Sequence, residues 1–189
     1  NGKARQVQQV LDGYDFYIEY YENGSAITKE GYPEKARTYF GFPPSKWHFV
    51  DAKRYRLAPS FDALLETGIE PEKINLPFLT AEARAEIWQR LEGLGGLRVT
   101  SSIPDNLEIN AAGADKGSAV LAVAGMLGLS RENVLALGDN GNDVTMLQAA
   151  GVSVAVADGS AEALAAAGYR TAPHDQDGLA QALKRFLGV

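Results

Sequence analysis

The sequence contains no cysteine among its 189 residues. This absence excludes disulfide bonds, thiolate nucleophiles and zinc sites built on cysteine ligands. Basic residues are also scarce, with 18 Lys and Arg against 24 Asp and Glu, so the net charge is −6 and the isoelectric point lies near 5.0. A chain with this balance has no basic footprint for nucleic acid and no polybasic stretch for a membrane surface. We therefore expect a small-molecule partner, with neither nucleic acid nor membrane.

Long apolar runs are missing as well. No stretch approaches the ~20 apolar residues that cross a bilayer, and no signal peptide opens the chain. These absences predict a cytoplasmic protein. With 46% hydrophobic and 22% charged residues, the composition indicates a globular chain with enough material for one or two domains.

The most informative stretch runs from residue 134 to residue 147, where an apolar run, a tight polar loop and a second apolar run follow one another. Residues 134–137 predict a strand buried on both faces, as in a parallel sheet. Asp139 then lies just past the carboxyl end of that strand, at the edge where open α/β sheets bind ligands. Asn142 or Asp143 is expected to cap a helix that begins here. The pattern predicts a strand, an acidic loop and a helix.

Three simpler interpretations of this loop compete with a functional one. Asn140 and Gly141 form a hairpin signal, but the residues after them lack the alternation of a return strand. A calcium loop needs Gly at its sixth position, where this chain has Val144. Plain turn and capping roles would explain one carboxylate. They give no reason for the crowding of Asp139 and Asp143 in one loop.

The two halves of the chain have different patterns. Residues 1–111 predict an antiparallel α+β unit with a hairpin turn at Asn23 and Gly24 and helices over one face of its sheet. From residue 112 strands and helices alternate, which predicts right-handed βαβ units and a parallel sheet. The expected fold class is α/β, with a partial Rossmann-like doubly wound parallel sheet at residues 112–189. Three strands are few for a sheet covered on both faces, so part of it is expected to be missing.

Individual elements are predicted from periodicity and turn residues. Thr80 and Ser160 are expected N-caps. The predicted strands are residues 15–21, 25–28, 47–51, 73–79, 97–102, 106–110, 134–137, 152–156 and 169–171, and the predicted helices are residues 33–40, 62–67, 81–91, 115–128, 143–150, 160–167 and 178–187.

Several short motifs in the second half carry a family resemblance. Lys116 and Gly117 open a predicted helix, Gly-Asp-Asn-Gly-Asn-Asp at residues 138–143 follows a strand, and an Ala-Gly-Val turn occupies residues 150–152. These segments resemble the third and fourth motifs of haloacid-dehalogenase (HAD) superfamily phosphatases. The similarity is closest to the Cof-type, subfamily IIB sugar-phosphate phosphatases, whose α+β cap is inserted in a Rossmann-like core. The resemblance covers residues 107–187, and residues 1–111 would be the cap.

The resemblance implies a Mg²⁺-dependent phosphatase that hydrolyses small phosphorylated metabolites through an aspartyl-phosphate intermediate. Asp139 would be a ligand of Mg²⁺, which takes only one or two protein carboxylates, and Asp143 would hold the same metal site together. Lys116, at a helix N-terminus, would bind phosphate. Asn142 would bind phosphate or a metal-bound water. The candidate catalytic residues are therefore Lys116, Asp139 and Asp143.

The opening motif of that family does not occur in this sequence. HAD phosphatases begin with an apolar strand followed by Asp-x-Asp-Gly-Thr, in which the first Asp attacks phosphorus. The one Asp-x-Asp-Gly here, residues 175–178, follows no buried strand and precedes no Thr, so we interpret it as a decoy. The chain also begins with Asn1 rather than Met. We expect a C-terminal fragment, inactive alone, whose partner is the missing N-terminal core segment.

Two other hypotheses remain open at this point. The chain could be a non-catalytic phosphate- or metal-binding module that acts with a partner chain, or part of a phosphomutase of the same superfamily. His48 and His174 have no partners at ligand or triad spacing and are expected to be surface or turn histidines. The aromatic residues between positions 14 and 21 are expected to pack in a strand.

Overall fold

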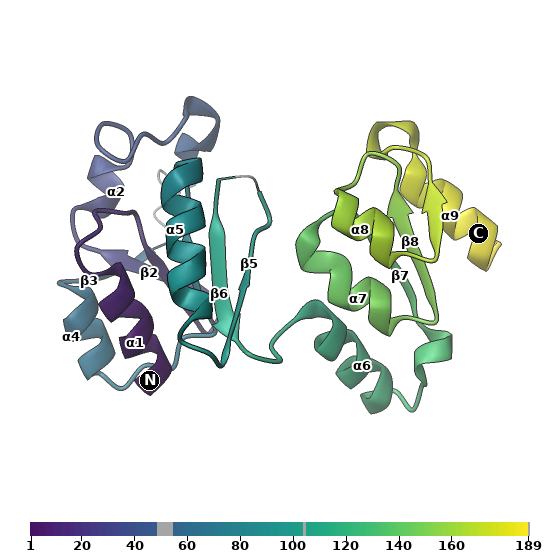
Figure 1. Ribbon diagram of the computed structural model, residues 1–189, viewed down its shortest axis with the longest axis horizontal. Helices are drawn as coiled ribbons and strands as arrows, with labels where there is room; N and C mark the ends of the chain where they lie inside the picture. The colour runs from purple at the N-terminus through teal and green to yellow at the C-terminus, as the bar shows by residue number, and fades with distance from the viewer. Residues whose placement is uncertain (49–54, 104, 189) are drawn as a thin grey trace. The chain divides into compact units, whose positions relative to one another are not determined.

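The computed structural model describes residues 1–48, 55–103 and 105–188. The chain divides into two compact units, Asn1–Ala112 and Gly113–Val189, and each has its own sheet (Figure 1). No helix in the described part of the chain is both long enough and apolar enough to cross a membrane.

The first unit is built on one six-stranded sheet. Its strands follow the order β3-β2-β1-β4-β6-β5 and are antiparallel, except for the parallel pair of β2 and β3. The strands are β1 (Glu19–Glu22), β2 (Ser25–Lys29), β3 (Tyr55–Ala58), β4 (Lys73–Leu76), β5 (Leu97–Thr100) and β6 (Leu107–Ala111). The helices are α1 (Gly2–Leu11), α2 (Tyr32–Lys35), α4 (Phe61–Glu66) and α5 (Ala81–Glu92), with a 3-10 turn η1 (Pro44–Lys46).

The hairpin of β1 and β2 closes through the predicted two-residue turn. Glu22 pairs with Ser25, and Asn23 and Gly24 between them have φ angles of 51° and 71°. Two successive positive φ angles give a turn whose twist matches that of the strands, and Asn-Gly adopts it at little steric cost. The predicted hairpin is confirmed.

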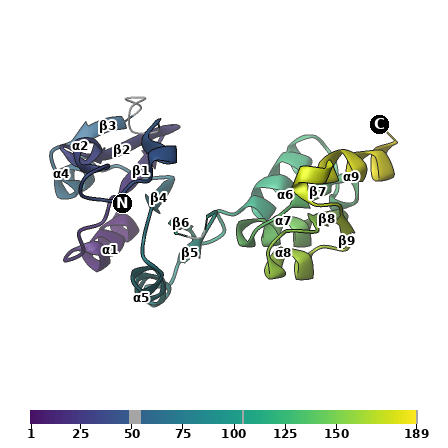
Figure 2. The same cartoon turned by 90° about the horizontal axis from the view of Figure 1, so that it is seen from above.

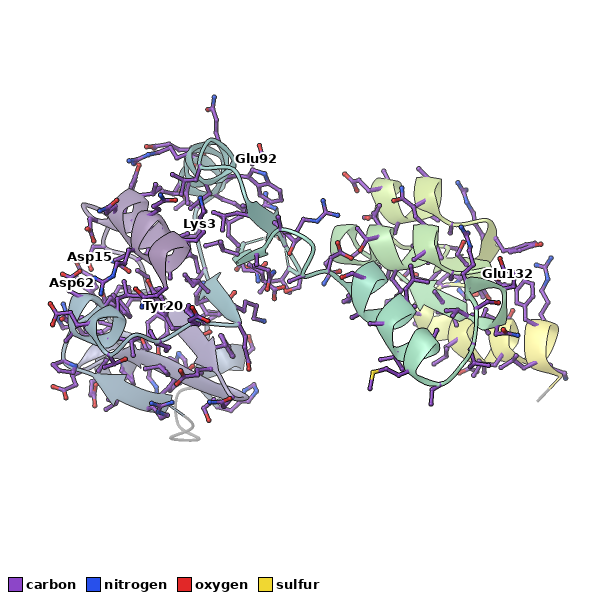
Figure 3. All side chains as sticks on the ribbon, turned by 90° about the horizontal axis from the view of Figure 1, so that it is seen from below. Lys3, Asp15, Tyr20, Asp62, Glu92 and Glu132 are labelled. Atoms are coloured by element: carbon purple, nitrogen blue, oxygen red, sulfur yellow. The ribbon has the colours of Figure 1, made fainter. Side chains whose placement is uncertain are left out.

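One face of this sheet carries the main core of the unit. Tyr20, Ile27 and Ile74 come from three adjacent strands, are at most 4% exposed, and belong to one cluster with apolar residues of α1, α4 and α5. Figure 2 shows α1 and α5 on the same side of the strands. Tyr20, labelled in Figure 3, donates a hydrogen bond from its hydroxyl to Gln8 Oε1 of α1 at 2.7 Å. The buried polar atom is therefore satisfied, as a close-packed core requires.

The opposite face of β1 carries a buried polar cluster around Glu19. Glu19 is 6% exposed, and its carboxylate accepts hydrogen bonds from the hydroxyls of Tyr21 and Tyr55 and from Asn75 Nδ2, at 2.8–2.9 Å. Burial raises the pKa of the Tyr55 hydroxyl, and the negative charge of Glu19 raises it further. Two of the aromatic side chains on this sheet face thus serve as hydrogen-bond donors as well as packing groups.

The structure corrects several predictions for the first half. The sequence pattern predicts neither α1 nor β3, and the helix predicted at residues 33–40 shortens to α2. Trp47 and His48 are helical, so the strand predicted at residues 47–51 is wrong at its start; residues 49–51 lie outside the described residues. The N-cap at Thr80 is confirmed, because its Oγ1 accepts a hydrogen bond from Ala83 N at 3.2 Å.

The second unit has a three-stranded parallel sheet in the order β7-β8-β9, which confirms the α/β fold class. The strands are β7 (Leu135–Gly138), β8 (Val152–Val156) and β9 (Tyr169–Thr171). The helices are α6 (Lys116–Met126), α7 (Val144–Ala149), α8 (Ala161–Ala166) and α9 (Gly178–Leu187), with 3-10 turns η2 (Arg131–Asn133), η3 (Gly141–Asp143) and η4 (His174–Gln176). The predicted elements of this half all occur, with small shifts at their ends.

A close approach of α6 to α7 depends on Gly117. A Cβ atom added there would lie 2.4 Å from the carbonyl oxygen of Thr145, which is far inside van der Waals contact. The backbone N–H of Gly117 also donates a hydrogen bond to Thr145 Oγ1 at 3.2 Å, across the same contact. This contact brings the first turn of α6, and with it Lys116, beside the loop that follows β7.

Candidate active site

The loops after β7 and β8 meet at the carboxyl edge of the parallel sheet. Asp139 follows the last residue of β7, and its carbonyl oxygen accepts a hydrogen bond from Ser160 N in the loop after β8, at 2.8 Å. A Cβ atom on Gly159 would lie 2.9 Å from the same oxygen, so the two loops pass very close to each other. Polar groups from different strands are therefore gathered at one edge, as parallel sheets favour.

Asp143 is the buried acid of the loop after β7, with 4% exposure. Its Oδ2 accepts hydrogen bonds from the backbone N–H groups of Asp139 and Asn140, at 3.0 and 3.1 Å. Its Oδ1 accepts one from Lys116 Nζ at 2.5 Å. A Cβ atom on Gly138 would lie 2.6 Å from Asp143 Cβ, so only glycine leaves room for this side chain to turn back under the loop.

The environment of Asp143 keeps it ionised. Burial alone would raise the pKa of its carboxyl, but the hydrogen bonds from Lys116 and from the two backbone N–H groups outweigh burial, so the pKa lies below its ordinary value. The sequence predicts an N-cap role for Asn142 or Asp143. Asp143 is the N-cap residue of α7, so the predicted position is confirmed. The predicted capping hydrogen bond does not form, because the Asp143 side chain instead accepts hydrogen bonds from the loop before the helix.

Lys116 occupies the first position of α6. Asp115 caps this helix, with its Oδ1 accepting from Ser118 N at 2.9 Å, so the N-terminal end is well defined. The Lys116 side chain stays 48% exposed although Nζ contacts Asp143. An ammonium group carries three donors, and Asp143 uses only one. Lys116 can therefore meet an anion while it remains paired.

Asp139 and Asn142 complete the predicted set. Asp139 is exposed, and Asn142 is half-buried in η3, next to Asp143. The Asp143 side chain accepts hydrogen bonds from the Lys116 side chain and from the backbone N–H of Asp139, so it connects these two residues. One acid thus anchors the loop while the other faces solvent.

The family follows from comparison with known proteins. The family model for haloacid dehalogenase-like hydrolases matches residues 3–183. This chain belongs to the haloacid dehalogenase-like hydrolases. It is 35% identical over 106 residues to the 5-amino-6-(5-phospho-D-ribitylamino)uracil phosphatase YcsE of Bacillus subtilis, a match that covers 56% of this chain and 43% of that protein.

Solved structures share the fold of this HAD-like hydrolase. A haloacid dehalogenase-like hydrolase from B. subtilis superposes with a TM-score of 0.79 at 23% identity, over 98% of this chain and 70% of the other. The HAD subclass IIB sugar phosphatase BT4131 superposes with a TM-score of 0.76 at 20% identity, over 99% of this chain and 66% of the other. The chain thus spans less than half of its curated relative and about two thirds of these structures.

In this HAD-like chain, the Asp139 carboxylate is the side chain of the site that suits Mg²⁺ as a ligand. Asp139 offers an exposed carboxylate, whereas both oxygens of Asp143 already accept hydrogen bonds. Among residues 1–48, 55–103 and 105–188, no three His, Asp or Glu side chains gather into a complete cage for a metal ion. Mg²⁺ does not require one, because it is usually held by one or two carboxylates together with water and substrate oxygens.

The structure adds an ion pair that sequence spacing does not reveal. His174 Nδ1 is hydrogen-bonded to Asp158 Oδ2, and His174 N donates to Asp158 Oδ1 at 3.0 Å. The hydrogen bond to Asp158 and its negative charge raise the pKa of the His174 ring. The prediction that His174 is a surface or turn residue is confirmed, since it opens η4 and its side chain is 78% exposed. Its contact with Asp158 is one that the search for ligand or triad spacing in the sequence did not find.

Proposed function

We propose that this HAD-like chain carries the metal- and phosphate-binding part of a Mg²⁺-dependent phosphatase for small phosphorylated metabolites, sugar phosphates among them. The observation that carries the proposal is the Lys116–Asp143 ion pair, held beside the exposed Asp139 at the carboxyl edge of the parallel sheet. The names of the relatives support the substrate class, since one is a phosphatase of a phosphorylated ribityl compound and another a sugar phosphatase.

The residues of the edge suit phosphoryl transfer, in which a protein mainly positions groups and offsets negative charge. Lys116 would donate to a phosphate oxygen, assisted by the N-terminal end of α6. Asp139 would hold Mg²⁺, which supplies charge neutralisation at the phosphoryl oxygens. Asn142 would donate its amide to phosphate or to a bound water. Asp143 would hold the Lys116 side chain and the backbone of Asp139 in position through its hydrogen bonds to both.

We assign residues 1–111 to a cap and residues 112–189 to the last part of the Rossmann-like core. The attacking group would lie outside this chain, on an N-terminal core segment, because no apolar strand followed by Asp-x-Asp-Gly-Thr occurs in the 189 residues. In the full reaction, a carboxylate oxygen of that segment attacks phosphorus and the ester oxygen leaves with a proton. Water then cleaves the aspartyl phosphate and releases inorganic phosphate.

Hydrolysis of p-nitrophenyl phosphate tests this proposal. We expect the chain alone, with Mg²⁺, to be no faster than buffer, and fusion of the coding sequence upstream of Asn1 to restore turnover. In the fused protein, Lys116→Gln and Asp139→Asn should each lower kcat by about 100-fold or more, because each removes charge stabilisation of the transition state. Turnover by the chain alone that disappears in Asp139→Ala would contradict the missing nucleophile.

The same experiment separates the alternatives. Phosphate binding without turnover, even in the fused protein, would favour a non-catalytic binding module. Transfer of phosphate between two hydroxyls of a sugar, in place of release to water, would favour a phosphomutase. Calorimetric titration of the chain alone with Mg²⁺ should give weak binding, since Asp139 is its one exposed carboxylate ligand in the proposed site.

A further inference from the structure

Asp158 holds the His174 ring at two points. The backbone N–H of His174 donates to one carboxylate oxygen at 3.0 Å, and the ring Nδ1 is bonded to the other. A carboxylate that contacts Nδ1 fixes which ring nitrogen points outward. In the part of the chain that the structure describes, Nε2 has no hydrogen-bond partner, and the side chain is 78% exposed. The ring is thus oriented and its second nitrogen is open.

This pair lies at the same edge as the candidate phosphate site. Asp158 follows β8, His174 follows β9, and both strands run parallel to β7, which ends before Asp139. The loop that carries Asp158 is bonded to Asp139 through Ser160 N at 2.8 Å. The negative charge of Asp139 also contributes to the raised pKa of His174. Topology, a hydrogen bond and electrostatics therefore agree on the location.

The charges at this edge indicate what His174 could bind. Asp139, Asp143 and Asp158 are negative, and the ammonium of Lys116 is already paired with Asp143. A phosphate group brought here needs additional positive charge or N–H donors, because charge-assisted hydrogen bonds are what stabilise an anion at a protein site. A protonated imidazole with a free Nε2–H supplies both.

We propose that His174 is a further substrate-binding residue of this site, with its ring oriented by Asp158 and its Nε2–H donating to an oxygen of the substrate phosphate. This inference rests on the proposed function, because it requires phosphate to bind beside Lys116 and Asp139. Asp158 acts through His174 and is a positioning residue.

The test uses the whole chain with Mg²⁺ and inorganic phosphate as the probe. The ring nitrogens of the two histidines, His48 and His174, are followed by ¹H–¹⁵N correlation NMR during a phosphate titration. We expect the Nε2 signal of His174 to shift with saturating behaviour and the His48 signals to stay unchanged. A residue that only joins two loops would not respond to phosphate.

Two variants separate binding from loop attachment. His174→Asn places an amide N–H where Nδ1 was, so it can still donate to Asp158, but it has nothing in the place of Nε2. We expect at most a small loss of thermal stability, because the charged pair with Asp158 lies at the surface. Phosphate binding should be about tenfold weaker, since one charge-assisted hydrogen bond is lost. His48→Asn is the matched control and should bind phosphate like the parent chain.

The possible outcomes distinguish this inference from the proposed function. If phosphate perturbs the amides of residues 138–143 while the His174 ring does not respond and His174→Asn binds normally, the inference is overturned and the proposed phosphate site stands. If phosphate perturbs neither region, the proposed site itself fails, and the role of His174 fails with it.

Discussion

The two units bury their apolar residues to very different extents. Among the described residues, the main cluster of the first unit contains 20 buried residues, most of them from its sheet and from α1, α4 and α5, whereas the cluster around β7 in the second unit contains four. Of the ten large apolar side chains that are exposed in the described residues, eight belong to the second unit. They are Leu121, Val123, Met126, Leu127, Leu129, Tyr169, Leu179 and Leu187. The first unit is the better-packed part of the molecule.

The sheet of the second unit is also less completely paired and less deeply buried than the sheet of the first. Four of the six strands in the first sheet have neighbours on both sides, whereas in the part of the chain that the structure describes only β8 of the second sheet does, and β7 pairs with β8 alone. Parallel strands usually lie inside a sheet with both faces covered, yet Leu135 and Leu137 of β7 are only half-buried. An open apolar edge next to exposed apolar helices is the kind of surface that a further segment covers. This agrees with the core segment that we propose as a partner.

The largest expected effect is in the core of the first unit. Leu91 in α5 is fully buried, so Leu91→Ala should lower the free energy of unfolding by about 2–5 kcal/mol through lost burial and a residual cavity. Leu127→Ala in the second unit removes a side chain that is 68% exposed, and should change the free energy by about 0.5 kcal/mol or less. Denaturant unfolding of both variants measures this contrast. Equal losses would show that the two units are packed alike.

A second prediction concerns the contact that positions Lys116. Gly117→Ala should destabilise the second unit by about 1–3 kcal/mol or more, because its Cβ would overlap the Thr145 carbonyl. Gly125 in the same helix has no atom within 4 Å of an added Cβ, so Gly125→Ala should stabilise by about 0.5–1 kcal/mol. Thermal unfolding compares the two. Similar stability of both variants would mean that α6 does not need its close approach to α7.

The sequence predicts the second unit better than the first, and the reason is physical. The strands and helices of a βαβ unit alternate along the chain, so local periodicity is enough to locate β8 (Val152–Val156) and α9 (Gly178–Leu187). In the first unit, β3 pairs in parallel with β2, and the paired residues are 29 positions apart (Ala26 with Tyr55), which no local pattern shows. The helix α1 has a local signal that the prediction missed, since Val7, Val10 and Leu11 follow helical spacing and are all buried.

The candidate site is predictable only in part for a similar reason. Lys116, Asp139 and Asp143 belong to motifs that can be recognised along the chain, and the structure brings them together. The contact between His174 and Asp158 joins residues 16 positions apart in two loops. It arises because β8 and β9 end at the same edge, and the tertiary arrangement determines which loop residues meet there.

A third prediction tests the exposed apolar surface. Met126 and Leu127 at the end of α6 are 86% and 68% exposed, so replacing both with Lys should reduce self-association of the chain without loss of stability. Leu57→Lys, at a half-exposed position of the first unit, is the matched control and should have no such effect. Sedimentation at increasing concentration measures association. A chain that is monomeric throughout, with slow hydrogen exchange along β7, would show that its edge is already protected.

The smallest expected effect is a pH dependence confined to the second unit. The hydrogen bond with Asp158 raises the pKa of His174, whose ordinary value is 6.5, and the hydrogen bond with His174 lowers the pKa of Asp158, whose ordinary value is 3.8. A raised pKa in the folded state contributes stability below the ordinary value and loses it as the pH rises through the raised one. A lowered pKa contributes stability above the ordinary value and loses it as the pH falls through the lowered one.

Together these shifts define the window in which the pair stabilises the fold. Its contribution should be complete between the two ordinary values, at about pH 5, and should be lost above the raised pKa of His174. Because both side chains are at the surface, the effect should be small and weaker at high salt. The difference in Tm between the parent chain and Asp158→Asn, measured at about pH 5 and about pH 9, tests this. Glu22→Gln in the first unit breaks an ion pair with Arg56 in which neither partner is a histidine, so its difference in Tm should be the same at both pH values. A difference for Asp158→Asn that persists at the higher pH would mean that Asp158 supports its loop without a charged His174.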